Sequence, residues 1–171
     1  MSLKERVYSV LIVSAAEGFN DALSALLPGT KYLPTHIVSN INAAKRALAE
    51  RAFDFVLINS PLPDDVGTRF AIDTSAHKET VVLFMVRAEL YDEMYDKVAE
   101  HGVFVLSKPT SKPIITTALG WLSSARERIR VQETKAHSLE DKMAEIKIVN
   151  RAKLLLISEL QMDESQAHSY I

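Results

Sequence analysis

The chain contains no cysteine among its 171 residues, which excludes disulfide bonds and thiolate metal sites. It has no run of about 18 apolar residues, so the sequence predicts no membrane-spanning helix. The N-terminus lacks the basic stretch and apolar core of a secretory signal. A net charge of −2 gives the whole chain no electrostatic attraction toward nucleic acid. These absences favour a cytoplasmic protein without a metal or another cofactor.

Apolar runs alternate with amphipathic stretches up to about Leu119. The runs are rich in Val, Ile, Leu and Phe, which is typical of parallel strands buried on both faces. The predicted strands are Val7–Val13, Thr35–Val38, Phe55–Asn59, Val81–Val86 and Val103–Ser107. The predicted helices are Gly18–Leu27, Asn42–Arg51, Gly67–Ser75 and Leu90–His101, with Gly102 as the C-cap of the last.

Five strands separated by four helices predict an α/β fold with right-handed crossovers and a doubly wound parallel sheet. In such sheets the functional crevice lies at the carboxyl ends of the strands. The residues that fall there are Ser14, Ala15, Asn59, Val86 and Lys108.

The alternating framework, which closes with a buried strand ending in Lys108-Pro109, resembles the receiver domain of bacterial response regulators. The resemblance covers residues 1–120 and implies a flavodoxin-like, five-stranded parallel sheet. It also implies a phosphorylation site at the carboxyl edge. That site has an acid pair after the first strand, an acceptor aspartate after the third, a Thr or Ser after the fourth and a lysine after the fifth.

Most of the positions that such a site uses carry other residues in this chain. The acid pair aligns with Ser14 and Ala15, the acceptor with Asn59, and the Thr or Ser with Val86, and only Lys108 is kept. An amide cannot form an acyl phosphate, and Mg²⁺ binds weakly without anionic oxygen ligands. The resemblance therefore predicts a pseudo-receiver that does not accept phosphate.

The role of Lys108 in such an altered pocket has three interpretations. It binds an anion beside Asn59, or it hydrogen-bonds Asn59 and mimics one locked state of a receiver. Alternatively, backbone carbonyls alone satisfy its ammonium group. Glu17, Asp64 and Asp65 are near in sequence, but loop acids are usually solvated, so we predict no metal site from them.

A different pattern begins after Pro113, because no further proline occurs before Leu160 and the only glycine is Gly120. Apolar positions three and four residues apart form the seam of a predicted coiled coil over residues 121–150. The seam includes Leu122, Ile129, Leu139, Met143 and Ile146. A seam of this length favours a parallel homodimer. The alternative is one long helix folded back on its own domain.

Residues 151–171 predict the beginning of a helical domain. Asp163 and Gln166 have the spacing of a capping box, and the helix that they start meets the chain end after about two turns. We therefore expect the sequence to be cut inside a domain.

The segment from Arg151-Ala152-Lys153 through an apolar run to Leu160-Gln161-Met162 resembles the start of the ANTAR domain. That domain is an RNA-binding module of bacterial transcription antitermination regulators. The resemblance covers about the last 30 residues and implies binding of RNA hairpins by a dimer. Basic and aromatic side chains read RNA loops, so the candidates are Arg151, Lys153, His168 and Tyr170. The alternative is that these side chains are solvated or, for Tyr170, part of a core.

The resemblances together predict a non-enzymatic response regulator of two-component signal transduction. The alternative is a dimerising protein-interaction module, with a protein partner at the receiver-like domain and no RNA binding. From Trp121 onward eight Lys or Arg balance eight Asp or Glu, so the charge pattern favours RNA only weakly. An enzyme on this sheet needs a Gly-rich phosphate loop, whereas residues 14–18 contain only Gly18.

Overall fold

The computed structural model describes residues 6–170. The chain divides into two compact units, Met1–Ile129 and Arg130–Ile171, which are described separately. None of the helices within the described residues is long and apolar enough to cross a membrane.

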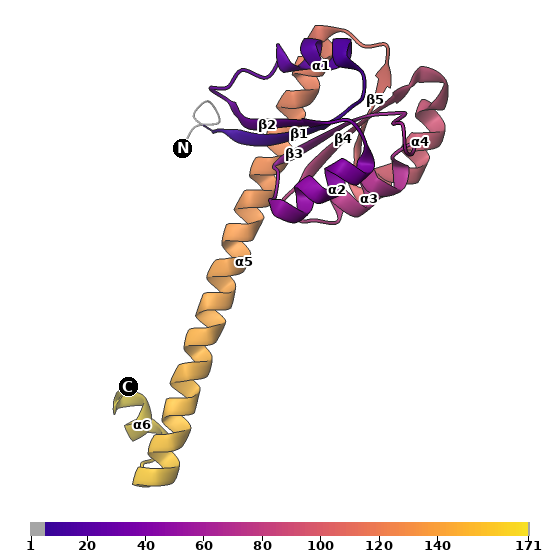
Figure 1. The fold of residues 1–171 in the computed structure, drawn as a ribbon. Helices are drawn as coiled ribbons and strands as arrows, with labels where there is room; N and C mark the ends of the chain where they lie inside the picture. The colour runs from indigo at the N-terminus through magenta and orange to yellow at the C-terminus, as the bar shows by residue number, and fades with distance from the viewer. Residues whose placement is uncertain (1–5, 171) are drawn as a thin grey trace. The chain divides into compact units, whose positions relative to one another are not determined.

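The first unit is built around a five-stranded parallel sheet with the strand order β2-β1-β3-β4-β5 (Figure 1). The strands are β1 (Tyr8–Val13), β2 (Tyr32–Val38), β3 (Phe55–Asn59), β4 (Val81–Arg87) and β5 (Phe104–Lys108). This order and the flanking helices are those of the flavodoxin-like, doubly wound fold, so the predicted fold class is confirmed.

Helices cover both faces of this sheet. The helices of the first unit are α1 (Glu17–Ser24), α2 (Ile41–Glu50), α3 (Thr68–Ser75) and α4 (Tyr91–Val98), with 3-10 turns η2 (Ala88–Leu90) and η3 (Ala99–His101). The long helix α5 (Lys112–Leu160) contributes its first turns to the same unit. One face packs against α1 and the start of α5, and the other packs against α2, α3 and α4 (Figure 1).

The apolar residues of each strand alternate between these two layers. In β1, Val10 and Ile12 join the core beside α1 and α5, whereas Leu11 and Val13 join the core beside the other helices. All four side chains are fully buried. A central parallel strand therefore needs apolar residues at successive positions, which explains the unbroken apolar runs of the sequence.

Several boundaries differ from the predicted ones by a few residues, and three of these differences have a clear local reason. Strand β2 begins at Tyr32 rather than Thr35, because an edge strand tolerates Pro34 with its missing N–H. Helix α3 begins at Thr68, since Gly67 has a positive φ of 99° that only glycine adopts readily. The predicted helix 90–101 is α4 followed by η3, and Gly102 caps it at φ 77° as predicted.

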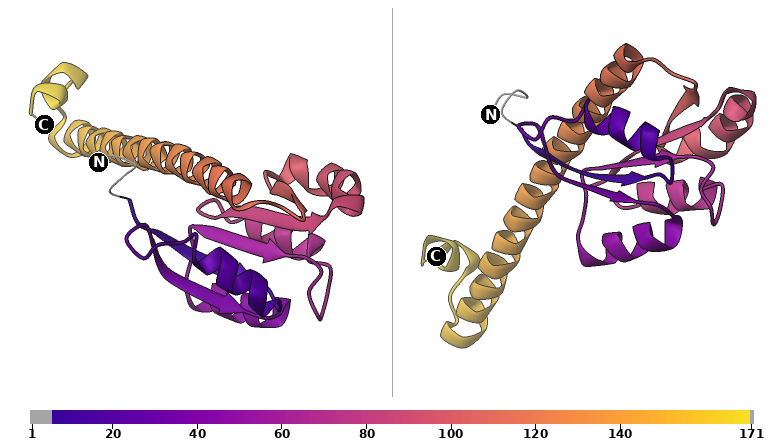
Figure 2. Two further views of the ribbon diagram at one scale, coloured as in Figure 1. Left: turned by 90° about the horizontal axis from the view of Figure 1, so that it is seen from above. Right: turned by 45° about the horizontal axis from the view of Figure 1, so that its top comes forward.

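Helix α5 continues without interruption from Lys112 to Leu160 (Figure 2). In the second unit it is followed by α6 (Glu164–Tyr170). The backbone N–H of Gln166 donates to Asp163 Oδ1 at 2.7 Å, and the N–H of Asp163 donates to Gln166 Oε1 at 3.1 Å. The predicted capping box is therefore confirmed.

Candidate functional site

Three polar side chains meet at the carboxyl edge of the sheet. Asn59 is the last residue of β3 and Lys108 is the last of β5, while Ser14 directly follows β1. Asn59 Nδ2 donates a hydrogen bond to Ser14 Oγ at 3.0 Å, and Lys108 Nζ donates to Asn59 Oδ1 at 2.5 Å. Lys108 Nζ also donates to the backbone oxygen of Ser60 at 2.5 Å. The amide of Asn59 is thus hydrogen-bonded to both Ser14 and Lys108. The acceptors of Lys108 are both uncharged oxygens.

The electrostatics of this pocket disfavour the charge on Lys108. Partial burial lowers the pKa of Lys108 below its usual value, and the positive charge of Arg87 lowers it further. Within the described residues, no carboxylate forms an ion pair with Lys108. The ammonium group of Lys108 thus faces an amide oxygen and a backbone carbonyl oxygen, both uncharged.

The remaining predicted pocket residues supply no oxygen ligand from their side chains. Ala15 is exposed and Val86 is buried in the core beside α4. The hydroxyl of Ser14 accepts from Asn59 and from the backbone N–H of Ala16 at 3.3 Å. No group of three or more His, Asp or Glu residues able to hold a metal occurs among residues 6–170.

The acids of the loop after β3 serve the backbone. Asp64 accepts from the N–H groups of Ile41 and Asn42 at 3.0 and 3.1 Å, which caps α2 and lowers the pKa of this carboxyl. Asp65 accepts from the N–H of Gly67 at 2.7 Å. Both carboxylates therefore have structural partners outside the pocket.

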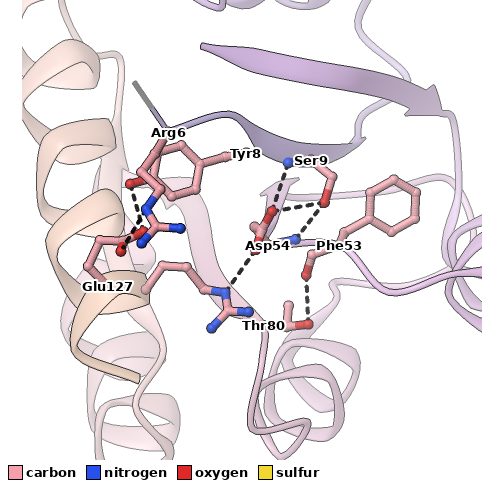
Figure 3. A network of polar contacts seen from close by, with 8 residues as sticks. Arg6, Tyr8, Ser9, Phe53, Asp54, Thr80 and Glu127 are labelled. Atoms are coloured by element: carbon pink, nitrogen blue, oxygen red, sulfur yellow. Dashed lines mark hydrogen bonds and ion pairs between the residues drawn. The ribbon is translucent and has the colours of Figure 1, made fainter. Parts of the chain in front are cut away.

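A second polar cluster, not predicted from the sequence, lies at the amino-terminal edge of the sheet (Figure 3). Asp54 Oδ1 pairs with Arg126 Nε at 2.8 Å, with only 14% and 8% of the two side chains exposed. Asp54 Oδ2 accepts from the N–H and the hydroxyl of Ser9 at 2.9 and 3.1 Å. The sequence signal that could have predicted this pair is the position of Asp54 between Phe53 and Phe55. A carboxylate in such apolar surroundings needs a charged or hydrogen-bonding partner.

Neighbouring contacts extend this cluster. The hydroxyl of Tyr8 donates to Glu127 Oε1 at 3.1 Å, and Arg6 Nε lies 3.4 Å from Glu127 Oε2. Figure 3 shows Arg6, Tyr8 and Glu127 turned toward one another. These contacts and the Asp54–Arg126 pair join α5 to β1 and to the start of β3. The cluster is a structural anchor of α5.

The predicted dimer seam has two different environments in the structure. Leu122 is fully buried in the core of the first unit, and Ile129 packs against that core. In contrast, Leu139, Met143 and Ile146 are 62%, 54% and 59% exposed. Of these five seam residues, only Leu139, Met143 and Ile146 have mostly exposed side chains.

The RNA-binding candidates lie on the last turns of α5 and on α6. Arg151 and His168 are exposed, and Lys153 is half-buried. Tyr170 is 70% exposed, so within the described residues it does not belong to a core. Ala167 is the buried residue of α6.

Comparison with known proteins places the fold, although no protein-family model and no curated protein matches the sequence. The signal receiver domain of an HD domain-containing protein from Pseudomonas fluorescens Pf-5 is similar, with a TM-score of 0.64 and 20% identity. That match covers 76% of this chain and 96% of the other. A two-component response regulator from Clostridium difficile gives 0.57 and 15%, covering 67% and 93%.

A third structure belongs to a family of redox sensors in the streptococci that evolved from two-component response regulators. Its TM-score is 0.62 with 20% identity, and the match covers 72% of this chain but only 54% of that one. This chain therefore spans about half the length of that protein. The first unit has the fold of response-regulator receiver domains.

Proposed function

We propose that this chain is a bacterial signal-transduction regulator of the ANTAR antitermination type, with a receiver-like domain that does not accept phosphate. The observation that carries the first part is the hydrogen-bonded set of Ser14, Asn59 and Lys108 at the carboxyl edge. In this set the amide of Asn59 occupies the phosphate-acceptor position. Ser14 occupies the position of one of the two acids that would bind magnesium.

The chemistry of phosphoryl transfer supports the proposal. A carboxylate oxygen attacks phosphorus in a receiver, and the product is an acyl phosphate; the neutral amide of Asn59 is far less nucleophilic. A magnesium ion needs anionic oxygen ligands, whereas Ser14 and Ala15 supply none. Lys108 alone cannot assemble a phosphoryl site, so the input to this domain differs from phosphorylation.

The RNA-binding part of the proposal rests on residues 151–170 and their resemblance to the ANTAR domain. Arg151, His168 and Tyr170 are exposed, as contacts to phosphates and splayed bases require. Residues 126–153 contain eight basic and five acidic residues, so this stretch carries a mildly positive net charge. Proteins that read RNA hairpins of this kind act as dimers, and the exposed seam residues provide the surface for a homodimer.

The RNA proposal is tested by gel-shift titration with a two-hairpin RNA at low salt. The protein includes any residues that follow Ile171 in the natural gene product. Arg151→Ala removes one phosphate contact and should weaken binding several-fold while reducing the salt slope by about 1. Tyr170→Ala removes a stacking platform and should weaken binding by about tenfold, from the 1–3 kcal/mol typical of one stacked base.

Arg46→Ala is the matched control, because Arg46 is also an exposed helical arginine but lies on α2 in the first unit, outside residues 126–153. It should bind like the parent protein. The absence of any shift at low salt contradicts the RNA proposal and favours the alternative, a dimerising protein-interaction module. The equal numbers of acidic and basic residues from Trp121 onward are the observation that favours this alternative.

A further inference from the structure

A cavity of about 320 Å³ lies between α1 and the segment that joins β5 to α5. One wall is apolar and consists of Phe19 and Leu23 from α1, Leu26 from the turn that follows α1, and Ile115 from α5. Small-molecule sites are concave, largely apolar and of about this size or larger. The cavity is therefore large enough for one small ligand with an apolar body.

The polar groups of the cavity come from one segment of the chain. Lys108, Thr110 and Lys112 line it, and no acidic residue does. The hydroxyl oxygen of Thr110 is buried and has no hydrogen-bond partner within the described residues. A buried polar atom without a partner is uncommon and costs free energy, so a hydrogen bond from a ligand to this hydroxyl would offset that cost. The segment from β5 to α5 thus contributes two lysines and a threonine to the lining, whereas α1 contributes apolar residues.

The ammonium group of Lys108 provides an independent reason for an anion. Both of its hydrogen bonds go to uncharged oxygens, those of Asn59 and Ser60. Its pKa is lowered by burial and by the positive charge of Arg87. A negative charge beside Lys108 stabilises the ammonium form and offsets both effects.

We propose that this cavity binds a small amphipathic carboxylate, with its aliphatic or aromatic tail against α1 and its carboxylate at Lys108, Thr110 and Lys112. The charge of the lining selects an anion, and the apolar wall selects one that carries a hydrophobic tail. The ligand contacts α1 and the start of α5 simultaneously. This binding is independent of RNA and supplies the receiver-like domain with a chemical input.

The test is isothermal titration of the whole chain with octanoate. We expect saturable binding at one site. Hexanoate lacks two methylenes and should bind about fifteenfold more weakly, because each buried methylene contributes about fourfold in affinity. Octanamide keeps the tail without the charge and should bind at least tenfold more weakly, as expected for loss of a hydrogen bond to a charged group.

Variants at exposed positions separate the site from general adhesion of a fatty acid. Ala22→Phe fills the cavity from α1 and should abolish binding, whereas Ala25→Phe places the same ring beside the cavity lining and should bind like the parent. Lys112→Ala should weaken binding at least threefold, and Lys97→Ala on α4 should leave it unchanged. The proposal is overturned by a lack of saturable binding, by equal affinity for octanamide, or by unchanged binding in Ala22→Phe.

Discussion

At Asn59, an NH₂ group in place of one carboxylate oxygen changes the chemistry at the carboxyl edge of the sheet, while the shape of the side chain is nearly the same. An amide has the shape of a carboxylate and still accepts a hydrogen bond from Lys108. It also donates to Ser14, which a carboxylate does not do. The network is therefore complete without metal or phosphate, and the lysine is left without a counter-charge.

This residue-level chemistry predicts that beryllium fluoride with magnesium leaves the protein unchanged. The measurement is a ¹H–¹⁵N correlation spectrum before and after addition, with amide positions near Asn59 as reporters. The matched variant combines Ser14→Asp, Ala15→Asp and Asn59→Asp, and restores the carboxylates that hold Mg²⁺ and the phosphoryl mimic. We expect shifts in this variant only. A magnesium-dependent change in the parent protein contradicts the inactive-pocket proposal.

The residues at the carboxyl edge were predictable from sequence because strand ends follow directly from apolar runs. Ser14, Asn59 and Lys108 each stand next to such a run, and parallel strands bring their ends together. The Asp54–Arg126 pair was not predictable in this way. Its partners are 72 residues apart, and one of them lies on a helix whose rotation about its axis the pattern leaves undetermined.

At the scale of elements, α5 combines two kinds of helix in one rod. Its first turns bury Ile115, Leu119 and Leu122 in the core, whereas its later turns expose Leu139 and Met143. The heptad-like spacing runs through both parts and does not distinguish them. Contacts with the sheet decide which apolar residues serve the fold, and those contacts are long-range.

The exposed part of α5 predicts self-association. Leu139→Asp combined with Met143→Asp places charges on the seam and should convert a dimer to a monomer, because desolvating these carboxylates in an apolar interface is costly. Light scattering coupled to sizing chromatography measures the mass. The control pair, Ser138→Asp with Ala144→Asp, adds the same charge at exposed positions off the seam and should remain dimeric. Equal masses for the parent and the seam variant refute the coiled-coil dimer.

At the scale of the whole molecule, the first compact unit includes part of the helix whose apolar spacing predicts a coiled coil from residue 121. The predicted receiver-like region ends at residue 120, but Leu122 and Arg126 are buried in the unit that extends to Ile129. The doubly wound sheet and its two helical layers follow from the alternation of apolar runs and helices, whereas the strand order does not. The end of the unit depends instead on the anchor at Asp54, which no local pattern encodes.

This difference predicts the stability of shortened chains. A chain ending at residue 120 leaves Asp54 without its arginine and removes the buried Leu122 side chain. It should lose at least about 3 kcal/mol of unfolding free energy relative to a chain ending at residue 130. Urea denaturation followed by circular dichroism gives both values. Coincident unfolding curves for the two chains show that α5 contributes nothing beyond residue 120.

The proline in β2 has a consequence for the behaviour of the protein at high concentration. Strand β2 forms one edge of the sheet, and its Leu33 and Ile37 side chains are 61% and 47% exposed. Such an edge is a template on which further strands add, chain after chain, into fibrils. Pro34 lacks the N–H that a continuous ladder needs, and it interrupts the ladder between these two apolar side chains. Pro34 is therefore expected to disfavour edge-to-edge assembly of this protein through β2.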